Sequence, residues 1–137
     1  MQRGDVGWPL LEDLKKRLLR LGGTDFQTED FLANQFFMNE LASLLAKGKK
    51  FDPKKTGVTY CKGLPHECHR NILEQVQKYP DRYTMYTGLA LSGDGMWRVH
   101  SWAVTKDGKI LESTVPRVFY YGAESGEEDG GVTVKYP

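Results

Sequence analysis

The stretch MWRVHSWAVTKDGKILESTV, residues 96–115, contains two strand patterns and the turn that joins them. Residues 96–105 and 109–115 are rich in β-branched and aromatic side chains, and the connection between them contains aspartate and glycine. Another strand pattern at residues 83–91 and an SGDG turn precede the stretch. It therefore predicts the centre of an antiparallel β-meander.

The TKDGK connection, residues 105–109, decides which side chains share a face of this meander. A two-residue turn would place His100 on the opposite face from Glu112. A three-residue turn at residues 106–108, with Gly108 as a glycine bulge, would instead pair Thr105 with Lys109. Trp102 would then lie opposite Glu112, with His100 as its diagonal neighbour on the same face. Gly108 at the third loop position suits the bulged turn, and the sequence leaves the other register open.

Helical patterns come before the strands. Regularly spaced leucines predict a helix over residues 9–21, and a second apolar pattern predicts one over residues 28–48. A third helix is expected over residues 68–79, beginning at Cys68, and the basic run at residues 47–55 is expected to be a solvated linker. Helices followed by strands indicate an α+β fold, in which N-terminal helices and a cysteine-bearing helix pack on an antiparallel β-sheet.

A chain of 137 residues suits a single domain covering residues 1–137. We expect a helical part at residues 1–50 and the core that carries the chemistry at residues 56–121. An acidic, glycine-rich loop and a short strand at residues 132–135 would complete the chain over residues 122–137.

Composition and charge narrow the class of protein. Apolar residues make up 39% of the chain and charged residues 27%, which is normal for a soluble globular protein. The formal net charge of +1 gives no reason to expect a nucleic-acid or membrane partner, and no signal-peptide or membrane-span pattern is present. Two cysteines do not make a disulfide framework. These features predict a cytoplasmic protein, although a secretion system that reads no such signal would leave no trace in the sequence.

Both cysteines and two of the three histidines fall in CKGLPHECHRN, residues 61–71. Zinc sites usually present ligands in pairs separated by two to four residues. The order here is Cys61, His66, Cys68 and His69, and the last two are adjacent, so that on a helix their side chains would diverge. We therefore expect no metal and no other cofactor.

Cys68 has the position of a nucleophile. It follows a Gly-Leu-Pro turn and begins a predicted helix, where unpaired backbone N–H groups stabilise a thiolate and could hold an oxyanion. His100 is the candidate base on the following strand pattern. Glu112 stands among apolar residues on the next one, where a carboxylate is costly unless a partner meets it.

This order of helix cysteine, His-Ser-Trp strand and Glu-Ser-Thr strand resembles the papain-like cysteine hydrolases. It is closest to their transglutaminase-like branch, in which a His-x-Trp strand is followed by an Asp-x-Thr strand. The similarity covers residues 68–114, about a third of the chain. The resemblance implies a papain-like core with Cys68 as nucleophile, His100 as base, Glu112 as orienting acid and Trp102 as a shield over the site.

Two departures from the family pattern affect the site. The acid is a glutamate rather than aspartate or asparagine, and no glutamine oxyanion donor stands shortly before Cys68. The oxyanion would therefore depend on backbone N–H groups or on Tyr60. His69 and Asn71 are further candidates to line the cleft, although the position of His69 at the helix start predicts a solvated side chain.

The implied function is thiol-dependent acyl transfer or hydrolysis of an amide or thioester, with a protein or peptide-like amide as substrate. Two alternatives stay open. Cys68 could be a small buried apolar residue beside a structural His100–Glu112 ion pair. The same fold could also be a binding module that presents aromatic residues to a partner: Trp97, Trp102, Phe119, Tyr120 and Tyr121.

Overall fold

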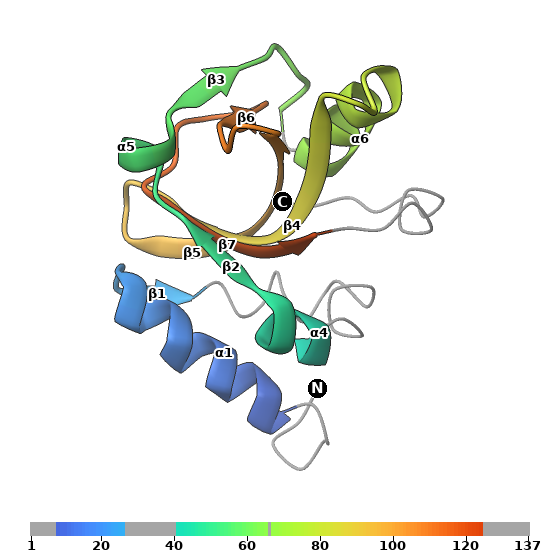
Figure 1. The fold of residues 1–137 in the computed structure, drawn as a ribbon. Coiled ribbons are helices and arrows are strands. Elements are labelled where there is room, and N and C mark those ends of the chain that lie inside the picture. Colours follow the sequence, from blue (N-terminus) through green and yellow to red (C-terminus); the bar gives the residue numbers. More distant parts are fainter. Residues whose placement is uncertain (1–7, 27–40, 66, 125–137) are drawn as a thin grey trace.

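The computed structural model describes residues 8–26, 41–65 and 67–124. Its elements are α1 (Trp8–Leu21), β1 (Asp25–Phe26), α4 (Leu41–Lys47), β2 (Lys49–Phe51), α5 (Pro53–Thr56), β3 (Val58–Tyr60), α6 (Cys68–Lys78), β4 (Tyr83–Leu91), β5 (Met96–Thr105), β6 (Ile110–Glu112) and β7 (Phe119–Glu124). The strands form one sheet in the order β2-β7-β4-β5-β6-β3, with β1 beside β5. The sheet curls on itself, as Figure 1 shows.

The predicted α+β class is confirmed, but the expectation of a purely antiparallel sheet is wrong. The β4-β5-β6 meander and the β4–β7 pair are antiparallel, whereas β3 runs parallel to β6 and β1 runs parallel to β5. Both parallel pairs join segments that are far apart in the chain. No local turn signal announces such a pair, which is why the sequence pattern missed it.

The expected linker at residues 47–55 is also corrected. It contains edge strand β2, which pairs with β7, and the short helix α5. Lys49 and Lys50 are exposed on this edge, where lysines discourage pairing with other chains. Residues 122–124, expected in the acidic loop, instead end strand β7. Most of the expected helix at residues 28–48 and the expected strand at residues 132–135 lie outside the described residues.

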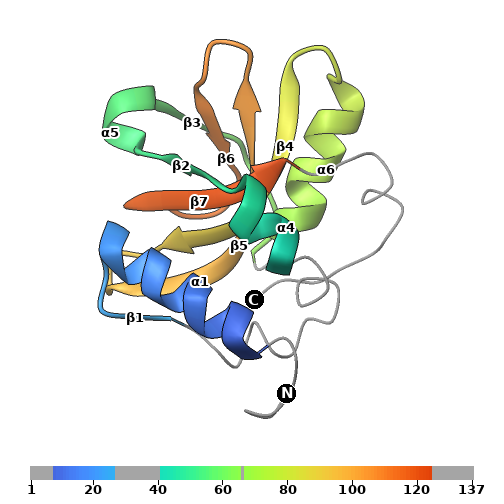
Figure 2. The ribbon, with the colours of Figure 1, turned by 60° about the horizontal axis from the view of Figure 1, so that its bottom comes forward.

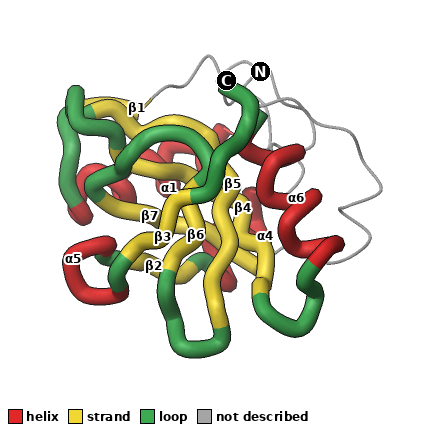
Figure 3. Tube along the Cα trace, turned by 90° about the horizontal axis from the view of Figure 1, so that it is seen from above, coloured by secondary structure: helices red, strands yellow, loops and turns green. Residues whose placement is uncertain are grey.

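Helices cover the outer face of the sheet. α1 and α4 pack on one part of it through Leu11, Leu14, Leu18 and Leu44, which are buried against Trp97 and its neighbours. α6 packs on another part and runs beside β4, as Figure 2 shows. Figure 3 places α6 and α5 on opposite sides of the curled sheet. None of the described helices is long and apolar enough to cross a membrane.

Aromatic residues fill the inside of the curl. Tyr86, Trp102 and Tyr120 are buried there with smaller apolar residues. The inward-facing positions of β4 and β7 include Gly88 and Gly122, which leave room for this packing. A methyl group added at Gly122 would lie 2.5 Å from the ring of Trp102. The interior is therefore a packed aromatic core, with His100 next to Trp102 at one end of it.

The TKDGK connection adopts the bulged turn. The backbone N–H of Thr105 donates to Lys109 O at 2.9 Å, and Gly108 has a φ of 89°. Ala103 pairs with Leu111 and Val104 with Ile110, so the register places Trp102 opposite Glu112. Only this register puts His100 and Glu112 on the same face, and it confirms the condition that the candidate triad required.

Candidate active site

Cys68 is the first residue of α6 and is 1% exposed. The N-cap residue, Glu67, makes no side-chain capping hydrogen bond, and the first helical bond runs from Asn71 N–H to Glu67 O at 2.9 Å. The N–H groups of the first turn therefore have no partner inside the helix. They are available to a thiolate or to an oxyanion formed beside it.

His100 and Glu112 form a buried pair. The Nε2 of His100 lies 2.8 Å from Glu112 Oε1 and 3.0 Å from Oε2, and the two side chains are 1% and 0% exposed. A carboxylate can only accept, so Nε2 carries the proton of this hydrogen bond. The other ring nitrogen, Nδ1, is buried and makes no hydrogen bond of standard geometry with the described residues. Glu112 therefore leaves Nδ1 as the nitrogen that can exchange a proton with Cys68.

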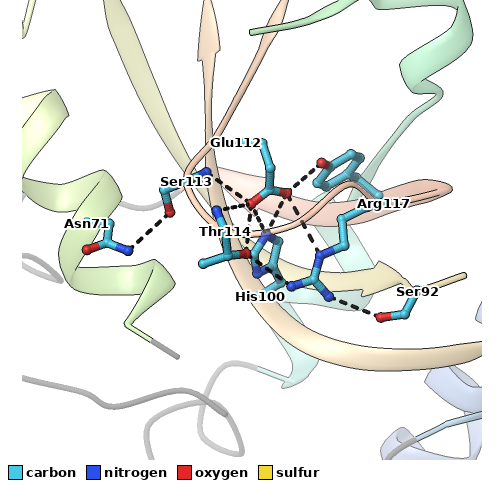
Figure 4. A network of polar contacts seen from close by, with 8 residues as sticks. Asn71, Ser92, His100, Glu112, Ser113, Thr114 and Arg117 are labelled. Carbon is cyan, nitrogen blue, oxygen red and sulfur yellow. Dashed lines mark hydrogen bonds and ion pairs between the residues drawn. The ribbon is translucent and has the colours of Figure 1, made fainter. Parts of the chain in front are cut away.

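Glu112 is held ionised by donors from three directions. Its Oε1 accepts from the Tyr120 hydroxyl at 2.6 Å, and its Oε2 accepts from the backbone N–H groups of Ser113 and Thr114, each at 3.0 Å. The hydroxyl of Thr114 donates to Oε2 at 3.1 Å. Figure 4 shows this network. Burial raises the pKa of Glu112, but the charge of His100 and these hydrogen bonds outweigh it and lower the pKa to about 2.

Cys68 and His100 change each other's pKa. Burial alone would raise the pKa of the Cys68 thiol, but the positive charge of the nearby His100 ring and the backbone N–H of Ser101 bring it below its usual value. Burial would lower the pKa of His100, but the charges of Cys68 and Glu112 raise it to about 9. Each charge therefore stabilises the other and shifts the pair toward thiolate and imidazolium, the form in which a cysteine is nucleophilic.

A cleft of about 240 Å³ reaches both Cys68 and His100. The residues on its wall include Gly63, Pro65, Cys68, His100, Thr114 and Arg117. Asn71 shapes this wall without lining it. Its side chain donates to Leu64 O at 2.9 Å and accepts from Leu64 N–H at 3.1 Å, and this holds the loop before α6. Asn71 is 8% exposed, so it supports the loop behind the cleft and does not line the cleft as predicted.

Three other predicted cleft residues lie elsewhere. Trp102 is fully buried, with its ring stacked on His100 at a centroid distance of 6.1 Å, so it supports the histidine from inside the sheet rather than covering the cleft. Tyr60 is 53% exposed on edge strand β3 and is not part of the cleft wall. His69 is 2% exposed and contacts Ser101 Oγ through Nδ1 at 3.1 Å. The expected solvated position of His69 is wrong, because the second residue of α6 faces the sheet.

Sequence reasoning missed Arg117 and Tyr120 as parts of the site. Tyr120 reaches Glu112 from β7, and Arg117 reaches the cleft from the loop before β7. Both residues stand only a few positions after the Glu-Ser-Thr motif in the sequence. The pairing of β7 with β4 is what returns this part of the chain to the site. The alternation in FYYGAE, in which Tyr120 and Gly122 share a face, was the signal available for that strand.

Metal ligation has no geometric support in the part of the chain that the structure describes, where no three His, Cys, Asp or Glu side chains gather closely enough to hold an ion. Comparison of the chain with protein-family models, with curated proteins and with solved structures gives no match. The geometry of the site is therefore the basis on which a function can be argued.

Proposed function

We propose that the protein catalyses thiol-dependent acyl transfer or hydrolysis of amides or thioesters through Cys68, His100 and Glu112. The observation that supports this proposal most directly is the hydrogen bond from His100 Nε2 to Glu112 at 2.8 Å. It leaves Nδ1 available to the thiol of Cys68 at the head of α6. We further propose a papain-like core of the transglutaminase-like branch. Its support is the order of helix cysteine, strand histidine and neighbouring strand acid.

In the first step the Cys68 thiolate attacks the carbonyl carbon of the substrate. A C–S bond forms, and the carbonyl electron pair moves to oxygen, where N–H groups at the head of α6 stabilise the charge. The imidazolium of His100 gives its proton to the leaving amine or thiolate as the bond to the carbonyl carbon breaks. The products are a thioester on Cys68 and the released leaving group.

In the second step water or an amine replaces the sulfur. Neutral His100 accepts a proton from this nucleophile through Nδ1, and the C–S bond breaks to regenerate the thiolate. Glu112 stays ionised throughout, since its pKa is about 2, and its hydrogen bond keeps the second proton on Nε2. Hydrolysis and transfer share this machinery, and the proposed substrate is a protein or peptide-like amide.

The structure weakens the aromatic binding-module alternative. Trp97, Trp102, Tyr120 and Tyr121 are each less than 5% exposed, and only Phe119 of that set is partly exposed. A purely structural ion pair would explain the contact between His100 and Glu112. It gives no reason for the cleft to reach Cys68 and His100 together.

Alkylation of the two cysteines as a function of pH tests the proposal. We expect iodoacetamide to modify Cys68 with a midpoint well below the usual thiol pKa of ~8.5, because His100 lowers the pKa of Cys68. Cys61 is the internal control, since burial and the charge of Glu112 raise its pKa. Mass spectrometry of the folded protein would give both rates. Equal rates with an ordinary midpoint, or a Cys68 that does not react, would refute the enzyme proposal.

A further inference from the structure

Arg117 places a positive charge on the wall of the cleft, and the proposed chemistry does not use it. It lies in the loop between β6 and β7 and lines the same cleft as Cys68 and His100. Its side chain is only 10% exposed. Arginine is among the residues most rarely buried, because its guanidinium stays charged at any pH that a protein tolerates. A nearly buried arginine beside a thiol nucleophile therefore needs a reason.

Neutral partners hold the guanidinium in place. Its Nη1 donates to Ser92 Oγ at 3.1 Å and its Nη2 donates to Thr114 Oγ1 at 3.2 Å, as Figure 4 shows. The loop itself is tied to the end of β4 by the hydrogen bond from Val118 N–H to Leu91 O at 2.8 Å. Hydroxyl groups fix the position of the guanidinium without removing its charge. The group is thus oriented before any substrate arrives.

The nearest carboxylate does not pair fully with Arg117. The Nε of Arg117 is 3.9 Å from Glu112 Oε1, and this nitrogen makes no hydrogen bond with the residues that the structure describes. Both oxygens of Glu112 already accept from His100, and Oε1 also accepts from Tyr120. Glu112 is 0% exposed, so its charge is not presented to the cleft. Among the described residues that line the cleft there is no aspartate or glutamate.

We propose that Arg117 makes the cleft selective for substrates that carry a carboxylate within a few bonds of the reacting carbonyl. The planar guanidinium matches the two oxygens of a carboxylate, and it has donors that Ser92 and Thr114 leave free. Its charge would hold the substrate carboxylate while the Cys68 thiolate attacks the carbonyl carbon. This inference rests on the proposed function, because it names the substrate class of the same site.

The selectivity can be measured without knowing the natural substrate. Iodoacetate and iodoacetamide alkylate a thiolate by the same displacement of iodide, and they differ in carrying a carboxylate or a neutral amide next to the reacting carbon. His100 also attracts the anionic reagent, so the contribution of Arg117 is the difference between the wild-type protein and Arg117→Met. In this variant we expect the rate at which iodoacetate alkylates Cys68 to fall about tenfold, which is the effect expected from removing one partly screened charge. Its rate with iodoacetamide should stay within about twofold.

Matched variants separate charge from structure. Arg117→Lys keeps the positive charge and should retain most of the iodoacetate rate. Arg98→Met removes an arginine that pairs with Asp94 outside the cleft wall, and it should leave both rates of Cys68 unchanged within about twofold. Thermal unfolding checks that each variant is folded, and Arg117→Gln takes the place of the methionine variant if that one is not.

The outcomes distinguish the two proposals. If both reagents slow equally in Arg117→Met, or neither slows, Arg117 does not select a carboxylate and the inference is wrong, while the thiol chemistry stands. If Cys68 of the wild-type protein reacts with neither reagent faster than Cys61 does, the proposed function fails, and the inference fails with it.

Discussion

Glu112 is the residue on which the site depends most directly. It is fully buried, yet donors from β5, from β7 and from its own loop meet both of its oxygens. Burying a carboxylate costs several kcal/mol unless such donors are present, so these contacts are what allow an acid at this position. The same contacts fix the orientation of His100, since Nε2 bonds to Glu112. One side chain thus links the stability of the fold to the orientation of His100.

Replacing the acid by its amide should separate charge from shape. In Glu112→Gln we expect turnover, or alkylation of Cys68 at pH 7, to fall roughly 100-fold, because an uncharged partner no longer holds the imidazolium. The amide also cannot accept from every donor around it, so the free energy of unfolding should fall by on the order of 2 kcal/mol. Rate measurements and urea unfolding would give both values.

Asp94→Asn is the matched control for this substitution. Asp94 also pairs with a basic side chain, that of Arg98, but it is 54% exposed and lies away from the cleft. Both rate and stability should change little in that variant. A rate in Glu112→Gln equal to that of the wild-type protein would remove the acid from the mechanism.

At the scale of elements, β5 supports two different environments. Its inward face presents His100 and Trp102 to the aromatic interior, while Trp97 and Val99 on its outward face pack under α1. Ser101, also outward, meets His69 of α6 and Thr87 of β4 at 3.1 Å each. The strand therefore brings His100 both to Glu112 of β6 and to the cleft beside Cys68 at the head of α6. The bulged turn at Gly108 sets that alignment.

The close packing of β7 against Trp102 gives a test at this scale. In Gly122→Ala the new methyl group would lie 2.5 Å from the Trp102 ring and 2.8 Å from Thr87 O, so the ring or the strand must move. We expect a loss of stability of about 2–3 kcal/mol and slower alkylation of Cys68, because Trp102 stacks on His100. Gly93→Ala is the matched control, since a methyl group there meets open space. Equal melting temperatures for the two variants would contradict this account of the packing.

For the molecule as a whole, His69 links stability to pH. Burial lowers its pKa to about 4 in the folded state, against 6.5 in the unfolded state. The unfolded chain therefore binds a proton at a higher pH than the fold does, and stability falls as the pH drops below about 6.5. Glu112 affects stability in a lower pH range. Its pKa is about 2 in the folded state, so the stability that its charge contributes is lost only as the pH falls below about 4.5.

Urea unfolding at pH 6.5, 5.5 and 4.5 tests this assignment. The wild-type free energy of unfolding should fall by on the order of 2 kcal/mol between pH 6.5 and 4.5. His69→Gln carries no titrating group, keeps a side-chain amide that can meet Ser101, and should lose most of this slope. An unchanged slope in the variant would place the acid sensitivity in another residue.

Local pattern was enough to predict the elements that carry the proposed triad. The helix beginning at Cys68 and the bounds of β4 and β5 follow from apolar periodicity and turn residues, and Gly108 pointed to the bulged turn. These features depend on neighbours a few residues apart. A turn's conformation and a strand's alternation are set largely by local sterics and by which face must be buried.

The tertiary structure decided what surrounds the triad. The parallel pairing of β3 with β6, the return of β7 that delivers Tyr120, and the entry of Arg117 into the cleft join segments with no shared local signal. The burial of His69 follows from where α6 docks on the sheet. Such contacts depend on the summed free energy of packing across the whole chain, in which many pairings compete. By itself the sequence therefore determined which residues form the proposed triad, and only the packed fold decided which donors and charges act on them.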